Sequence, residues 1–169
     1  MPIELTTPLS EEAIAALQIG DMVYLSGEIF CGRDAVLPKL VNMSEEEIIA
    51  MLGKSLHGSV MFHTAVSRAG VGPTSSNKLE IESSIEPLSA KGVKLHLGKG
   101  ALHPETVAAL QRHNAVYAVI PPVTALLGKQ TLSQAVAAFP ELGMEALHLL
   151  KVDRYPAIIA AAKGRSIYE

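Results

Sequence analysis

The order of its local sequence patterns most constrains the fold of this chain, because β-like runs alternate with helix-like runs throughout its 169 residues. Residues 22–31 are rich in β-branched and aromatic side chains, which is typical of a strand. Residues 45–52 follow a capping box that begins at Ser44 and precede Gly53, which is typical of a helix. No repeat or linker interrupts the alternation. The pattern predicts one α/β domain over residues 1–169, with helices packed on a mixed sheet.

The other elements are expected from the same patterns. Further helices are expected at residues 10–19, 78–91, 104–113 and 132–139, with a short one through Leu127. Further strands are expected at residues 59–66, 93–97, 115–120, 145–152 and 157–162. The Ser26-Gly27 pair predicts a hairpin or a bend within residues 22–31.

The composition indicates an aliphatic core. The chain is 49% hydrophobic, but it has no tryptophan and only four tyrosines and three phenylalanines. Its core must therefore consist mainly of Ala, Val, Ile and Leu. The apolar content is compatible with two arrangements, a surface that faces another subunit or copy of the chain and a compact alanine-rich monomer.

Charge, hydropathy and cysteine content exclude several classes of protein. The net charge is −3 and the basic residues are scattered, which argues against nucleic-acid binding. No apolar run reaches the length of a membrane helix, and the N-terminus does not have the pattern of a signal peptide. The one cysteine, Cys31, is consistent with the cytoplasm and cannot alone ligate an iron–sulfur cluster.

Three loops that follow β-like runs each carry a cation beside or after glycine. They are "CGRDA" with Arg33, "AGVGPTSSNKLE" with Lys78, and "LGKGA" with Lys99. Loops at the carboxyl ends of strands tend to meet at one ligand crevice, and three cations there would suit a small dicarboxylate. Each loop taken alone is also compatible with an ordinary surface turn, which is the favoured interpretation of the Arg33 loop considered by itself. The Walker spacing is absent from the second loop, which argues against nucleotide binding.

The six histidines show no metal-ligand spacing such as H-E-x-x-H. His63 and His96 lie in expected strands that lead toward the cationic loops, so either could contact a ligand. An ordinary half-buried histidine is the more frequent alternative at such positions.

The order and spacing of five motifs resemble those of a known family. The motifs are "LSGEIFCGRDA", "GVGPTSSNK", "VKLHLGKGAL", "AVYAVIPP" and "LGMEALHLLKVDRYPAIIA". The family is the β subunit of the iron–sulfur-dependent hydro-lyases, of the class I fumarase and L(+)-tartrate dehydratase type. The resemblance runs from about residue 5 to the end of the printed sequence. It implies a swivelling β/β/α domain, equivalent to the C-terminal domain of the single-chain fumarases.

The resemblance also implies a partner and a set of site residues. A separate α subunit would carry the [4Fe-4S] cluster, and this chain alone would bind none. Thr74 and Lys99 would be catalytic, and the substrate would be bound by Arg33, Asp34, Gly72, Ser75 and Lys78. The chain departs from many members at two positions, because Leu37 replaces a histidine and Lys78 replaces an arginine.

The implied activity is reversible hydration of fumarate to malate, or dehydration of tartrate. The motifs do not separate fumarate, tartrate and a methylated analogue. A second interpretation is a non-catalytic module that binds a small dicarboxylate or other anion. A third is a structural subunit whose loops only contact another chain.

Overall fold

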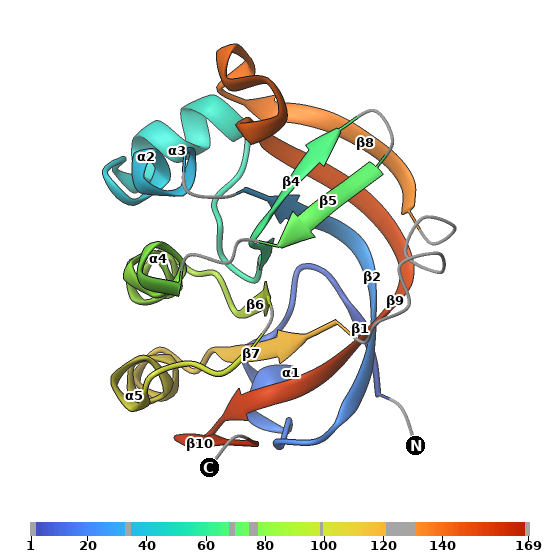
Figure 1. The fold of residues 1–169 in the computed structure, drawn as a ribbon, viewed down its shortest axis with the longest axis vertical. Coiled ribbons are helices and arrows are strands. Elements are labelled where there is room, and N and C mark those ends of the chain that lie inside the picture. Colours follow the sequence, from blue (N-terminus) through green and yellow to red (C-terminus); the bar gives the residue numbers. More distant parts are fainter. Residues whose placement is uncertain are drawn as a thin grey trace.

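The computed structural model describes residues 3–32, 35–67, 70–74, 78–98, 100–120 and 131–167. Helices α2 to α5 form a layer on one side, and strands β8 and β9 curve along the other (Figure 1). The helices are α1 (Glu11–Ala15), α2 (Leu37–Val41), α3 (Glu45–Leu52), α4 (Lys78–Ala90), α5 (Pro104–Arg112) and the 3-10 helix η1 (Pro140–Glu145). The strands are β1 (Ile3–Thr6), β2 (Met22–Cys31), β3 (Val60–Phe62), β4 (Thr64–Ser67), β5 (Gly70–Thr74), β6 (Leu95–Gly98), β7 (Val116–Val119), β8 (Thr131–Ala138), β9 (Leu147–Ala162) and β10 (Arg165–Ser166).

The main sheet closes on itself. Strands β2, β3, β6 and β7 pair in that order and are parallel. Strand β9 is antiparallel to both β7 and β2, so it completes a ring of five strands. β1 is added to β2, β8 and β10 are added to β9, and β4 with β5 forms a separate hairpin. The predicted mixed α/β architecture is confirmed, but the sequence did not reveal the closure.

Alternation along the strands divides the core between the inside of the ring and its helix-covered side. Phe62 and Leu97 belong to the large cluster to which every strand of the ring contributes. Met61, one residue before Phe62, packs instead with Leu88 of α4 in the cluster beneath the helices. Because side chains alternate between the two faces of a strand, residue 63 follows Met61 to the helix-covered face.

The helices expected at residues 45–52, 78–91 and 104–113 are confirmed as α3, α4 and α5. At the start of α3, the Ser44 hydroxyl accepts from the Glu47 backbone N–H, and the Glu47 carboxylate accepts from the Ser44 N–H. Gly53 ends the helix in the left-handed conformation, as the capping pattern predicted.

Four expectations need correction or refinement. The helix expected at residues 132–139 is wrong, because this segment pairs with β9 as strand β8. The strands expected at 145–152 and 157–162 are one 16-residue strand, β9. Residues 59–66 are divided at His63 into β3 and β4, and part of the following loop forms β5. Residues 22–31 form a single strand with a pairing irregularity after Leu25, and no hairpin. The expected short helix through Leu127 lies outside the described residues.

Gly92, which follows α4, has a backbone conformation and a close contact that both favour glycine. Its φ is +112°, and a Cβ atom there would lie 2.5 Å from the His57 Cα atom. We expect Gly92→Ala to lower the free energy of unfolding by about 3 kcal/mol, because backbone strain and overpacking add. Gly53→Ala is the matched control, since Gly53 has φ +81° but nothing within 4 Å of the added atom. Gly53→Ala should lower the free energy of unfolding by about 1 kcal/mol. Urea denaturation monitored by circular dichroism measures both variants. If both variants lost the same unfolding free energy, the close approach to His57 would not contribute to the effect of Gly92→Ala.

Candidate functional site at the carboxyl edge of the parallel strands

Three parallel strands of the ring, β2, β3 and β6, end side by side, and the predicted loops with Arg33 and Lys99 follow β2 and β6 in the sequence. Cys31 of β2 pairs with Phe62 of β3, and Phe62 pairs with Leu97 of β6. Since the strands are parallel, these residues mark one carboxyl edge of the sheet. The ends of these three strands are therefore neighbours, and the predicted convergence of the cationic loops on one ligand crevice stays a prediction.

Backbone pairing holds the residues that come just before the cations of the three loops. The Gly32 N–H donates to the Phe62 carbonyl oxygen at 3.0 Å, immediately before Arg33. Gly98, immediately before Lys99, pairs with Val119 of β7. In the hairpin, Thr74 pairs with Thr64, which is two residues beyond the end of β3. The points from which the three loops leave are therefore attached to neighbouring strands.

The predicted site residues themselves are described only in part. Four of them lie outside the described residues, namely Arg33, Asp34, Ser75 and Lys99. For three others the structure gives the backbone, which places Gly72 and Thr74 in β5 and Lys78 at the first position of α4. The roles implied for all seven stay predictions.

Two buried histidines lie beside this edge, and they form a connected chain with a serine of α4. His63 Nε2 lies 3.1 Å from His96 Nδ1, and His96 Nε2 lies 2.9 Å from the Ser89 hydroxyl oxygen. Both imidazole rings are fully buried. Among the residues that the structure describes, His63 Nδ1 has no hydrogen-bond partner.

Burial keeps both rings uncharged. It lowers the pKa of His63 to about 4. Burial, and secondarily the neighbouring His63, lowers the pKa of His96 well below its usual value. At neutral pH each ring is therefore one donor and one acceptor. The sequence placed both histidines in strands that lead to the loops, but it gave no sign that they contact each other.

Cys31 does not provide a metal ligand at this edge. It is fully buried in the cluster inside the ring, and burial raises the pKa of its thiol. Within the described ranges, no group of three or more His, Cys, Asp or Glu side chains could hold a metal ion. The described part of this chain therefore does not fit an iron–sulfur cluster.

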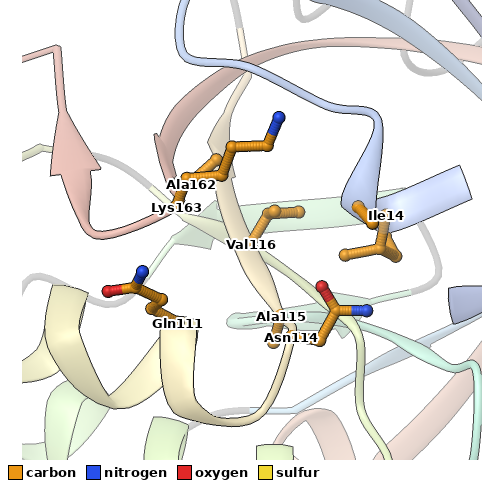
Figure 2. A pocket seen from close by; sticks show the side chains of 8 residues that line it. Ile14, Gln111, Asn114, Ala115, Val116, Ala162 and Lys163 are labelled. Atoms are coloured by element: carbon orange, nitrogen blue, oxygen red, sulfur yellow. The ribbon is translucent and has the colours of Figure 1, made fainter. Parts of the chain in front are cut away.

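A cavity of about 270 Å³ lies at the opposite, amino edge of the parallel strands (Figure 2). Val116, the first residue of β7, and Ala162, the last of β9, line it together with Ile14. Its polar lining includes Gln111 and Lys163. One cation among amides is a weaker match for a dicarboxylate than the three predicted cations at the other edge.

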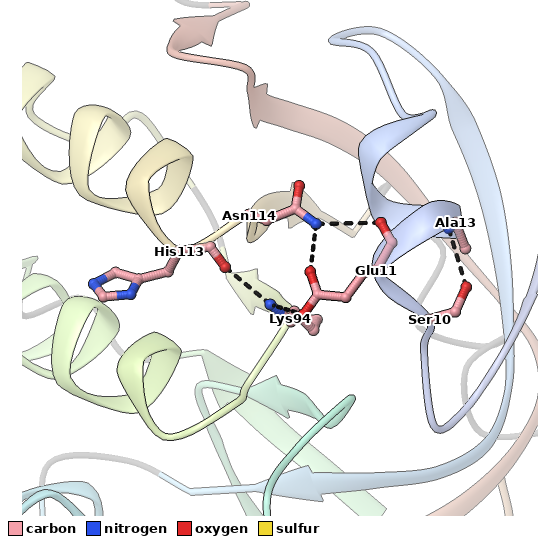
Figure 3. A network of polar contacts seen from close by, with 6 residues as sticks. All are labelled: Ser10, Glu11, Ala13, Lys94, His113 and Asn114. Atoms are coloured by element: carbon pink, nitrogen blue, oxygen red, sulfur yellow. Dashed lines mark hydrogen bonds and ion pairs between the residues drawn. The ribbon is translucent and has the colours of Figure 1, made fainter.

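A polar network beside this cavity joins α1 to the segments around β6 and β7 (Figure 3). The buried Lys94 ammonium lies 2.7 Å from Glu11 Oε1 and donates to the His113 carbonyl oxygen at 2.9 Å. Asn114 Nδ2 donates to Glu11 Oε2 at 2.6 Å. The hydrogen bond from Lys94 lowers the pKa of Glu11. Since Lys94 already contacts a carboxylate and a carbonyl oxygen, we interpret the network as structural.

The two partners of this ion pair should differ in their contribution to stability. The Lys94 side chain is 6% exposed and that of Glu11 is 52% exposed. Glu11→Ala leaves a buried ammonium without its carboxylate and should cost about 2 kcal/mol of unfolding free energy, whereas Lys94→Met leaves a solvated carboxylate and should cost about 1 kcal/mol. Urea denaturation measures the unfolding free energy of the two variants. A larger loss in Lys94→Met than in Glu11→Ala would contradict this account.

In the described part of the chain, no helix combines the length and apolar character needed to cross a membrane.

Comparison with known proteins identifies the family. A family model described as "Fumarase C-terminus" matches residues 1–169. The L(+)-tartrate dehydratase subunit beta of Escherichia coli is 29% identical over 168 residues, which cover 93% of this chain and 81% of that protein. A candidate L(+)-tartrate dehydratase subunit beta of Methanocaldococcus jannaschii is 27% identical and covers 95% of this chain and 88% of its own length. A candidate class I fumarate hydratase of Geobacillus stearothermophilus is 29% identical over 99% of this chain but only 34% of its own length. The family predicted from the motifs is confirmed, and the chain belongs to the fumarase C-terminus family.

Proposed function

We propose that this chain is the β subunit of an iron–sulfur-dependent hydro-lyase. The reaction is reversible hydration of fumarate to malate, or dehydration of tartrate, carried out together with a separate α subunit. Membership of the fumarase C-terminus family and the names of the relatives support this assignment. The single cysteine further supports an assembly in the reducing cytoplasm.

The observation that carries the proposal is the meeting of three strand ends at one edge. Gly32 is bonded to β3, the backbone of Thr74 pairs beside the end of β3, and Gly98 ends β6. Loops that leave such neighbouring points can surround one small ligand. The alternative of unrelated surface turns gives no reason for these attachment points of the backbone to be neighbours.

Arg33, Lys78 and Lys99 are proposed to bind the substrate's carboxylates. The guanidinium of Arg33 suits bidentate contact with one carboxylate, and the lysines act as point charges. Asp34 and Ser75 are proposed to complete the polar contacts. Glycine at position 72 is proposed to let the backbone come close to the ligand.

Thr74 is proposed to exchange the proton on the reacting carbon. An aliphatic hydroxyl is a poor base at neutral pH, so it needs positive charge nearby to stabilise its alkoxide. Lys99 is proposed to supply that charge and to stabilise the negative charge that develops on the substrate as the proton leaves.

The α subunit is proposed to carry the [4Fe-4S] cluster, because the described residues of this chain offer no ligand set for it. When bound, an open iron site of such a cluster supplies a Lewis acid for the substrate hydroxyl. We propose that this chain swivels as a domain against that partner.

Strand β8 supports association with another chain. Two of its apolar side chains, Leu132 and Val136, are 60% and 49% exposed. Among the described strands, β8 pairs with β9 and with no other strand. Exposed apolar side chains on a strand edge are typical of a surface that another chain covers. We propose that the α subunit or a second copy of this chain covers it.

Co-expression with the cluster-bearing subunit, anaerobic reconstitution and a panel of fumarate, malate, L(+)-tartrate and mesaconate tests the proposal. Turnover that requires both subunits is the expected result. Tight dicarboxylate binding by this chain alone, without turnover in the complex, would favour the non-catalytic module. If Arg33→Ala and Lys99→Ala alter assembly but not KM, the structural interpretation holds instead.

A further inference from the structure

The hydroxyl of Tyr117 in β7 contacts the Gly-Lys-Gly segment, residues 98–100, that includes the end of β6. Tyr117 is 1% exposed and belongs to the cluster beneath the helices that contains Ile85 of α4 and Leu110 of α5. Its hydroxyl oxygen lies 3.0 Å from the Gly100 carbonyl oxygen. A carbonyl oxygen can only accept, so the tyrosine hydroxyl is the donor. The core of the domain is therefore bonded directly to the residue after Lys99.

The two glycines of this segment fit the contact in different ways. Tyr117 pairs with His96 across β6 and β7, and its side chain extends along the strands past Gly98. A Cβ atom on Gly98 would lie 3.1 Å from the tyrosine hydroxyl oxygen and 3.2 Å from its Cε1 atom, so a larger residue would force the ring to shift. Gly100 has a φ of +78°, in the left-handed region that favours glycine. The position of Tyr117 and the backbone conformation together account for both glycines.

Both neighbours of Lys99 are held by β7, although Lys99 itself lies outside the described residues. Gly98 pairs with Val119, and Gly100 is bonded to Tyr117. Consecutive Cα atoms are about 3.8 Å apart, so a single residue between two held neighbours has few backbone positions to adopt. We propose that Tyr117 is a positioning residue for Lys99, because its hydroxyl holds the segment that presents this lysine to a carboxylate of the substrate. The inference rests on the proposed function for the role of Lys99.

A purely structural role is the alternative, because a buried tyrosine hydroxyl needs a hydrogen-bond partner wherever it lies. The two roles differ in their dependence on Lys99. If Tyr117 acts through Lys99, loss of its hydroxyl weakens ligand binding only while the lysine is present. If its role is structural, the loss has the same effect with and without the lysine.

A double-mutant cycle with Tyr117→Phe and Lys99→Ala distinguishes these roles. Succinate is the probe, because it is a dicarboxylate with no double bond to hydrate and no hydroxyl to lose. Calorimetry on the assembled complexes measures its dissociation constant. Tyr117→Phe keeps the ring and should weaken succinate binding about fivefold, as expected for the loss of one neutral hydrogen bond. In the Lys99→Ala background the same change should have an effect of less than about twofold. Equal effects in the two backgrounds, or no effect in either, would overturn the inference.

Tyr155→Phe is the matched control for this experiment. Tyr155 is also fully buried, and it belongs to the cluster inside the ring. Its hydroxyl oxygen lies 2.9 Å from the Thr131 hydroxyl oxygen, so the substitution likewise removes one buried hydrogen bond. Because this bond does not contact residues 98–100, Tyr155→Phe should leave the dissociation constant of succinate unchanged.

Amide hydrogen exchange of the full chain provides a second readout, which requires neither ligand nor turnover. Tyr117→Phe should speed exchange of the amides at residues 99–101 about fivefold, and Tyr155→Phe should leave it unchanged. Unchanged exchange in Tyr117→Phe would overturn the inference. Absence of both succinate binding and turnover in the wild-type complex would instead contradict the proposed function, and the exchange rates would still decide whether Tyr117 holds this segment.

Discussion

Thr74→Val in the assembled enzyme is expected to lower kcat by about 10²- to 10⁴-fold, the usual contribution of a positioned acid or base. Valine is close to threonine in shape and lacks the hydroxyl that is proposed to exchange the substrate's proton. KM should change little, since the proposed carboxylate contacts of Arg33 and Lys99 are retained. Steady-state rates of fumarate hydration and malate dehydration measure both constants.

Thr74→Ser is the matched control for this experiment. It keeps a hydroxyl at the same backbone position in β5 and should retain most of the turnover. Circular dichroism and size-exclusion chromatography of each complex establish that folding and assembly are unchanged. Near wild-type turnover in Thr74→Val would show that another group handles the proton.

Acid is expected to destabilise the fold through the buried histidine pair. In the unfolded chain a histidine has a pKa of about 6.5. Burial lowers the pKa of His63 to about 4 in the folded protein, so between these values the unfolded state binds more protons. The free energy of unfolding should therefore fall as the pH falls from about 6.5 to about 4, by about 3 kcal/mol from His63 alone. His96 acts in the same direction, because its pKa is also lowered.

Urea denaturation between about pH 7.5 and about pH 5 measures this effect apart from the carboxylates. Glu11, Glu47 and Glu82 have lowered pKa values, so their stabilising contributions are lost only below the usual carboxylate range, about 4.3 for glutamate. A double variant in which His63 and His96 are both leucine should show a much smaller loss of stability in this window.

The exposed histidine at position 57 provides the control for the acid experiment. His57→Gln should keep the wild-type dependence of unfolding free energy on pH. If the double leucine variant also kept it, the buried pair would not be the cause of the acid sensitivity.

The elements that the sequence predicted well are those with local signals. Helix α3 has its capping box and terminal glycine within ten residues, and α5 begins with proline at its first position. Such signals do not depend on distant parts of the chain. They were sufficient for these two helices.

Strand β8 shows why other elements were not predictable. Its sequence "LSQAVAAF" overlaps β8 and is rich in alanine, which favours a helix when the segment is considered alone. The segment is a strand because it pairs with β9 from Thr131 to Ala138. Pairing between segments is a tertiary effect that overrides intrinsic propensity.

The candidate site also has parts that local signals predicted and parts that depend on pairing between distant segments. Glycine and cations after β-like runs predicted loops that meet at one edge. The described backbone places the ends of β2, β3 and β6 side by side, and the meeting of the loops stays a prediction. The contact between His63 and His96 arises because Met61 pairs with His96 in the register of β3 and β6. A single sequence does not give that register, so the chain of buried polar groups became evident only in the folded protein.

Closure of the sheet by β9 has a consequence for how the protein forms. β2 is made early in synthesis, but the strand that covers its edge along nearly its whole length is β9, more than a hundred residues later. Until β9 emerges from the ribosome, a nascent chain exposes the edge of β2 and the apolar interior behind it. Because the decisive contacts join such distant segments, we expect folding to be slow for a domain of this size and to depend on release of the complete β9 segment.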